Sequence, residues 1–96
     1  MSSRFNGKHC VVTGAAGGIG SSVAKRLADE GAKLTLVDLD MSALENLGEK
    51  LRTETSISHS HIFLKAADVS KASEVRDYID ASVENHGSID CFHNNV

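Results

Sequence analysis

The 96-residue sequence contains no proline and no tryptophan, and only 4% of its residues are aromatic. It therefore has no proline-rich linker, and we find no internal repeat or low-complexity segment. No apolar run approaches the roughly 20 residues of a membrane span, and residues 1–4 do not resemble the start of a signal peptide. These absences predict a cytoplasmic location and no membrane partner.

Charge, cysteine and histidine are also sparse. The formal net charge is -3 and there is no basic block, so we expect no nucleic-acid partner. The two cysteines, Cys10 and Cys91, exclude a disulfide scaffold and are expected to be buried thiols on neighbouring strands. His59 and His61 form an H-x-H pair, but two ligands do not make a zinc site, and the other three histidines are expected at polar boundary positions. We predict no metal.

A glycine-rich turn between an apolar strand and a helix is the most specific motif in the chain. Residues Phe5–Thr13 read as a buried strand, and Gly14 allows a sharp turn out of it. Gly18 and Gly20 have no side chain, which lets a pyrophosphate come close to the turn and lets the helix pack closely on the strand. The helix is expected to begin near Ile19, with a dipole equivalent to roughly half a positive charge at its N-terminus. The turn predicts a phosphate-bearing nucleotide.

Asp38 identifies the nucleotide further. It follows a second buried strand and lies 18 residues past Gly20, close to the roughly 20 expected for an acidic residue that binds ribose hydroxyls. Its carboxylate would repel the extra phosphate of NADP by about 4 kcal/mol per unit charge at 4 Å and dielectric 20. Leu39, Asp40 and Gly17 supply no compensating cation, so NAD is favoured over NADP. The alternative for Asp38 is a turn or helix-capping role.

Four segments resemble the classical short-chain dehydrogenase/reductase family, and together they span essentially the whole chain. Thr13–Gly20 matches the TGxxxGxG signature, and residues 5–8 resemble the lead into the first strand of the family. Residues 67–69 resemble the adenine-contacting segment, and residues 94–96 look like the start of the NNAG motif. Within the family, the stretches 31–38 and 67–70 are most similar to NAD-dependent reductases of cyclic ketones, such as the levodione reductases.

The resemblance implies a cofactor site but no catalytic residue in this chain. In the family, a serine and a tyrosine followed four positions later by lysine support hydride transfer between nicotinamide and an alcohol or ketone. The only tyrosine, Tyr78, is followed four positions later by Ser82. We therefore expect residues 1–96 to be the N-terminal, NAD-binding half of a single, incomplete Rossmann-type domain, from a family member that is a homo-oligomer when complete. The cofactor-binding residues implied are Gly14, Ala16, Gly17, Gly18, Ile19, Gly20, Asp38, Leu39, Asp68, Val69, Asn94 and Asn95.

The remaining pattern alternates strands with helices. It predicts an α/β fold, a Rossmann-type doubly wound parallel sheet truncated to four strands in the order 3-2-1-4, with three helices. In this order the first two helices cover one sheet face, and Gly14 and Asn94 meet at the switch point. The helix predicted at 19–30 carries an apolar stripe of Ile19, Val23 and Leu27 and ends at Gly31. The further predicted elements are a strand at 33–37, a helix from Met41 to about Thr53 capped by Asp40, a loop at 53–60, a strand at 61–66, a helix capped by Ser70 that ends near His86, and a strand at 89–93.

Two other functions stay open at this point. The chain could be a short, non-catalytic product of the same family that binds nucleotide or a full-length partner. It could also be another Rossmann protein that uses an adenosine ligand, such as a methyltransferase, although the glycine spacing and Asn94-Asn95 argue against this. The asparagine pair could stabilise the strand beside the cofactor, or it could simply form a turn.

We predict that the purified 96-residue chain reduces no ketone and oxidises no alcohol with NAD. The physical reason is that the sequence provides no tyrosine followed four positions later by lysine to transfer the proton. The measurement is the change in NADH absorbance with a panel of cyclic ketones and alcohols. Detectable hydride transfer would contradict the prediction. A tyrosine and lysine at this spacing, encoded beyond Val96, would favour the enzyme over the non-catalytic alternative.

Overall fold

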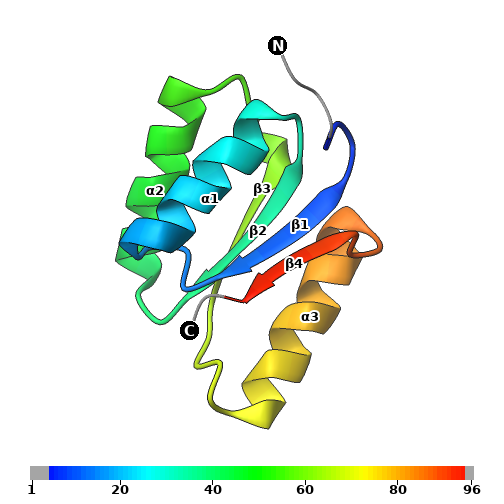
Figure 1. The fold of residues 1–96 in the computed structure, drawn as a ribbon. Coiled ribbons are helices and arrows are strands. Elements are labelled where there is room, and N and C mark those ends of the chain that lie inside the picture. The colour runs from blue at the N-terminus through cyan, green and yellow to red at the C-terminus, as the bar shows by residue number, and fades with distance from the viewer. Residues whose placement is uncertain (1–4, 95–96) are drawn as a thin grey trace.

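All the strands that the structure describes are parallel and belong to one sheet. The structure is a computed structural model that describes residues 5–94 (Figure 1). In chain order its elements are β1 (His9–Thr13), α1 (Gly18–Asp29), β2 (Lys33–Asp38), α2 (Met41–Glu54), the 3₁₀ turn η1 (His59–His61), β3 (Ile62–Ala66), α3 (Ala72–His86) and β4 (Cys91–Asn94). The strand order is β3-β2-β1-β4, as predicted.

Two apolar clusters hold helices on opposite faces of this sheet. Figure 1 shows α1 and α2 on one face and α3 on the other. Side chains alternate along a strand, so Val12 packs in the larger cluster with α1 and α2, whereas Val11 packs with Tyr78 of α3 in the smaller cluster. The central strands are therefore buried on both faces, as the apolar runs predict. Among residues 5–94, no helix is long and apolar enough to cross a lipid bilayer.

Three of the four described strands begin later than the sequence pattern predicts, whereas β2 begins at Lys33 as expected. Phe5 and Gly7 lie in a turn before β1, because the Lys8 N–H donates to the Phe5 carbonyl at 2.8 Å and Gly7 has a positive φ of 76°. The strand therefore starts at His9. The other two late starts are β3 at Ile62, because His61 belongs to the 3₁₀ turn, and β4 at Cys91 rather than at residue 89.

The residues of helix α1 that face the core are smaller than those of the predicted apolar stripe. Ile19, expected on the apolar face, is 67% exposed. The buried positions are Gly20, Ala24, Leu27 and Ala28, because the helix lies so close to the turn after β1 that only a residue without Cβ fits at its start. A Cβ on Gly20 would overlap the Gly14 carbonyl oxygen and lie 2.9 Å from Ala15 Cα. The predicted glycine end of this helix is confirmed, since Gly31 follows it with φ 90°.

Of the predicted N-terminal caps of the other two helices, one is confirmed and one is wrong. The Asp40 cap of α2 is confirmed, since Asp40 Oδ1 accepts the Ala43 N–H at 3.3 Å. The predicted Ser70 cap of α3 is wrong. Ser70 instead donates both its N–H and its hydroxyl to Asp68 Oδ1, so the chain makes a further turn and the helix starts at Ala72.

Two of the polar side chains in the sheet differ from expectation. Cys10 and Cys91 are register partners on neighbouring strands, as predicted, but only Cys10 is fully buried. Burial, followed by the proximity of Cys91, raises the pKa of the Cys10 thiol to about 12. His9 is 2% exposed rather than at a polar boundary, because its ring finds hydrogen-bond partners inside the fold.

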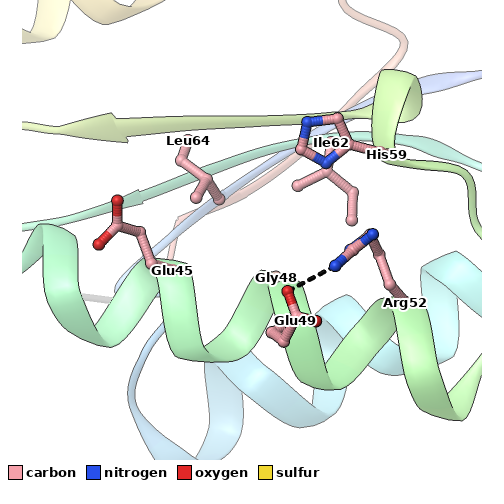
Figure 2. Close-up of a pocket in the computed structure, with 7 residues that line it drawn as sticks. All are labelled: Glu45, Gly48, Glu49, Arg52, His59, Ile62 and Leu64. Atoms are coloured by element: carbon pink, nitrogen blue, oxygen red, sulfur yellow. Dashed lines mark hydrogen bonds and ion pairs between the residues drawn. The ribbon is translucent and has the colours of Figure 1, made fainter.

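A groove of ≈ 260 Å³ runs between α2 and the edge strand β3 (Figure 2). Ile62 and Leu64 point from β3 towards Gly48 on α2, and Arg52 donates to Glu49 at 2.5 Å along its rim. The groove contains none of the predicted cofactor residues. Its lining residues are Glu45, Gly48, Glu49, Arg52, His59, Ile62 and Leu64.

We predict that Gly48→Ala stabilises the fold. The new Cβ would lie 3.8 Å from Leu64 Cδ1, which is ordinary van der Waals contact, and alanine is favoured over glycine inside a helix by about 1 kcal/mol. The expected result is an increase of about 1 kcal/mol in the free energy of unfolding, or roughly 4–8 °C in Tm. Urea and thermal unfolding followed by circular dichroism measure it, and an unchanged or lower stability would show that the groove cannot take the methyl group.

The same substitution in α1 should have the opposite effect. Gly20→Ala places a methyl group against the backbone of Gly14 and Ala15, which cannot rotate away as a side chain could. Overpacking of this kind costs about 1–3 kcal/mol. We expect an equal or larger loss in the urea unfolding experiment, with Gly48→Ala as the matched control for the change in helix propensity. Wild-type stability in Gly20→Ala would mean that α1 does not pack on the turn as described.

Candidate functional site

The polar loops of the protein gather at the carboxyl edge of the sheet. Because the strands are parallel, the turn after β1, the turn after β2, the connection after β3 and the end of β4 all lie along this edge. The reversal in strand order falls between β1 and β4, where Thr13 and Asn94 are register partners. This is the position at which open α/β sheets bind their ligands.

The turn after β1 is built by backbone hydrogen bonds and glycine conformations. Gly14 has φ 62°, a region that residues with a Cβ avoid, and its carbonyl accepts the Gly17 N–H at 3.1 Å. Gly17 lies at the N-cap of α1 without any side-chain hydrogen bond, and the space above Gly18 is open. The first N–H groups of α1 therefore lie beside Gly17 and Gly18, which have no side chain to block the approach of an anionic group.

Asp38 ties this turn to the turn after β2. Its Oδ2 accepts the Ala16 N–H at 3.0 Å, and its Oδ1 accepts the Leu39 N–H at 2.7 Å and the Asp40 N–H at 3.4 Å. The turn-forming role that the sequence left as an alternative is thus present. A carboxylate has about four lone-pair sites, so Asp38 keeps capacity to accept a hydrogen bond from a ligand hydroxyl.

Asp68 is fixed in the connection between β3 and α3. Its hydrogen bonds from the hydroxyl and the N–H of Ser70, at 2.6 and 2.9 Å, lower its pKa. Its own N–H donates to Glu74 Oε1 at 2.8 Å, and Val69 packs against the smaller apolar cluster. Sequence reasoning missed Glu74 as a support of this loop. The sequence does contain a sign of this role. Glu74 lies three residues after Lys71, the N-cap of α3, and an acidic side chain at this position can accept a hydrogen bond from the backbone before the helix.

Asn94 joins the ends of the two strands at the switch point. Thr13 Oγ1 donates to Asn94 Oδ1 at 2.8 Å, and Asn94 is the last residue of β4 rather than part of a turn. This geometry supports the strand-stabilising alternative for Asn94. The predicted partner Asn95 lies outside the residues that the structure describes. Sequence reasoning had not assigned Thr13 a role at the site, although it belongs to the glycine motif.

Two large apolar side chains lie exposed beside these polar groups. Ile19, in the first turn of α1, is 67% exposed, and Leu39, directly after Asp38, is 72% exposed. The carboxyl edge thus offers free helix N–H groups, a carboxylate and apolar surface, which can bind a ligand with an anionic group, hydroxyls and a flat apolar ring. In the described part of the chain, no group of three or more His, Cys, Asp or Glu side chains could hold a metal ion.

Comparisons with known proteins agree with this arrangement. The family model for short chain dehydrogenases matches residues 8–96. A levodione reductase of Leifsonia aquatica is 38% identical over 93 residues, which cover 97% of this chain and 34% of that protein. The structure of an NAD⁺-bound xylitol dehydrogenase superposes with a TM-score of 0.88 at 36% identity, over 97% of this chain and 34% of that one. The NADP-containing C-domain of a bacterial malonyl-CoA reductase gives 0.91 at 28% identity, over 98% and 15%.

These matches confirm the family and fold that the four sequence segments predict. The chain spans about a third of the length of the curated relatives that it matches. The family model starts just before β1 and includes the glycine turn, Asp38 and Asn94. On this match, the chain belongs to the short-chain dehydrogenase family.

Proposed function

We propose that the carboxyl edge of this sheet binds NAD and that the chain is the cofactor-binding part of an oxidoreductase. The observation that carries the proposal is the half-buried Asp38 carboxylate, which is hydrogen-bonded to both flanking turns beside an uncapped helix N-terminus. In such an enzyme a hydride passes between the nicotinamide and an alcohol or ketone. The chain covers about a third of its relatives, so this activity is proposed for a protein of their length.

Different described residues would contact the different parts of the cofactor. The pyrophosphate would lie over Gly17 and Gly18, where no side chain blocks the first N–H groups of α1. The adenosine ribose would donate one hydroxyl to Asp38. The adenine would lie between Leu39 and the segment after β3 that includes Asp68 and Val69, because Leu39 offers 72% exposed apolar surface there. The nicotinamide half would extend towards Asn94 at the end of β4, and Asn95, the next residue in the sequence, is proposed to take part as well.

The preference for NAD over NADP rests on charge. Asp38 would face the 2′-phosphate of NADP, and among the residues that follow β2, Leu39 and Asp40 provide no cation to offset this repulsion. The solved relatives include one bound to NAD⁺ and one with NADP, so the family alone does not decide the cofactor. The preference is therefore inferred from the side chains of this chain.

We predict that the chain binds NAD at least tenfold more tightly than NADP, and that Asp38→Asn removes most of this difference. Asparagine keeps an oxygen for the Leu39 N–H but loses the charge that repels the 2′-phosphate. A tenfold ratio corresponds to about 1.4 kcal/mol, well within the Coulomb energy of a partly screened pair. The measurement is titration of isotope-labelled chain with each cofactor, followed by the backbone amide shifts of residues 14–20.

Asp40→Asn is the matched control for the loss of one negative charge. Asparagine is as good a cap as aspartate, so α2 keeps its N-terminal hydrogen bond and the preference for NAD should persist. If NAD and NADP bind equally well to the unmodified chain, or if the two variants behave alike, Asp38 does not read the ribose. If neither cofactor shifts residues 14–20, the carboxyl edge is not the cofactor site.

A further inference from the structure

The connection between β3 and α3 is a short loop, residues 67–71, which borders the proposed adenine position. At its start, the Ala67 N–H donates to the Asp38 carbonyl at 3.0 Å. At its end, the Lys71 N–H donates to the Asp68 carbonyl at 3.1 Å. These two backbone bonds fix where the loop begins and ends, but neither of them holds the N–H of Asp68.

Glu74, in the first turn of α3, holds that N–H. Its Oε1 accepts the Asp68 N–H at 2.8 Å. An acidic residue three positions after an N-cap typically accepts the N–H of the N-cap itself. Here that N–H, on Lys71, is already bonded to the Asp68 carbonyl, so the Glu74 side chain reaches back past the cap to the loop. The contact is thus made with Asp68 rather than with the end of the helix.

The charge of Glu74 has a weaker partner. Its Oε2 lies 3.9 Å from Lys71 Nζ, and the two side chains are 38% and 64% exposed. Exposed ion pairs of this kind contribute little to stability, because water screens them and both side chains lose freedom. The accepted N–H, rather than the ion pair, is therefore the contact through which Glu74 can act on the loop.

The Asp68 carboxylate has one oxygen to offer a ligand. Its Oδ1 accepts both the hydroxyl and the N–H of Ser70, whereas its Oδ2 accepts no hydrogen bond from the described residues. The bond from the hydroxyl, followed by that from the N–H, lowers the pKa of Asp68, so its carboxylate is ionised at neutral pH and only accepts. Adenine carries a 6-amino group that donates, and hypoxanthine carries an oxygen in its place. A fixed Asp68 would therefore favour an adenine nucleotide over a hypoxanthine nucleotide.

We propose that Glu74 is a positioning residue of the cofactor site, which holds the Asp68 N–H so that the Asp68 carboxylate meets the 6-amino group of adenine. The inference rests on the proposed function, because it concerns the loop that borders the adenine of the same site. Glu74 does not touch the cofactor in this arrangement and acts only through the backbone of Asp68. Without its Oε1, the loop would have to be ordered when the cofactor binds, which lowers affinity and weakens the choice of base.

Two variants separate the hydrogen bond of Glu74 from its charge. Glu74→Asp keeps the negative charge near the N-terminus of α3 but is one methylene shorter, so it should lose the bond to the Asp68 N–H. Glu74→Gln loses the charge but keeps a side-chain oxygen at the same reach. Each variant therefore serves as the matched control for the other. Both change a half-buried side chain without adding volume, so both proteins should fold.

The binding experiment is titration of the isotope-labelled chain with NAD and with its hypoxanthine analogue, followed by the backbone amide shifts of residues 14–20. The unmodified chain and Glu74→Gln should bind NAD about three- to tenfold more tightly than the analogue, the range expected for one hydrogen bond. In Glu74→Asp this ratio should fall towards one, because Asp68 is no longer held in place.

The outcomes distinguish this inference from the proposed function. If NAD shifts residues 14–20 but Glu74→Asp keeps the ratio of the unmodified chain, the role of Glu74 is overturned and the cofactor site stands. If Glu74→Gln loses the ratio and Glu74→Asp keeps it, the charge at the helix N-terminus decides the preference, which also overturns the proposal. If NAD causes no shift in the unmodified chain, the proposed function fails and the role of Glu74 fails with it.

Amide hydrogen exchange without cofactor tests the positioning step by itself. The Asp68 N–H should exchange about three- to tenfold faster in Glu74→Asp than in Glu74→Gln, because only glutamine can still accept it. The Ala67 N–H, which donates to Asp38, is the internal reference and should exchange alike in both variants. Equal protection of the Asp68 N–H in the two variants would overturn the proposal whatever the cofactor does.

Discussion

The contact between α1 and the turn after β1 is the constraint on which the carboxyl edge depends. Gly20 packs where a Cβ would overlap the Gly14 carbonyl oxygen, so the helix can start directly above the strand end. This position directs the first N–H groups of α1 over the edge and also orients the backbone of the turn. The same turn presents the Ala16 N–H to Asp38 on the neighbouring strand. The absence of a side chain at Gly20 therefore lets the helix terminus lie directly against the turn that is hydrogen-bonded to the carboxylate.

Hydrogen bonds extend this constraint along all four strand ends. The Ala15 N–H donates to the Val37 carbonyl at 3.1 Å, the Ala67 N–H donates to the Asp38 carbonyl at 3.0 Å, and Thr13 bonds to Asn94. The first two bonds each join a loop to a neighbouring strand, and the third joins the ends of two strands. Loops held in this way lose little conformational entropy when a ligand binds, so more of the interaction free energy is available for affinity.

The elements that the sequence predicts are those set by local chemistry. Buried β-branched runs, glycine ends and the Asp40 cap depend on neighbours a few residues away, so the strand order, three helices and the place of Asp38 follow from the pattern. The differences arise where a distant partner decides. Ser70 bonds to Asp68 instead of capping α3, and Ile19 loses its place in the core because Gly20 is the residue pressed against the turn. The burial of His9 depends on Thr35 and on the end of α3, neither of which local periodicity can locate.

The two edges of the parallel sheet carry different kinds of chemical groups. The carboxyl edge gathers groups that gain from a ligand: uncapped helix N–H groups, a carboxylate and exposed apolar side chains. The amino edge is closed by packing, and its imidazole rings are satisfied within the protein. Helix α3 connects the two, because Glu74 in its first turn accepts the Asp68 N–H and His86 in its last turn reaches Leu34. The loop that follows β3 and the amino end of β2 are therefore held by opposite ends of the same helix.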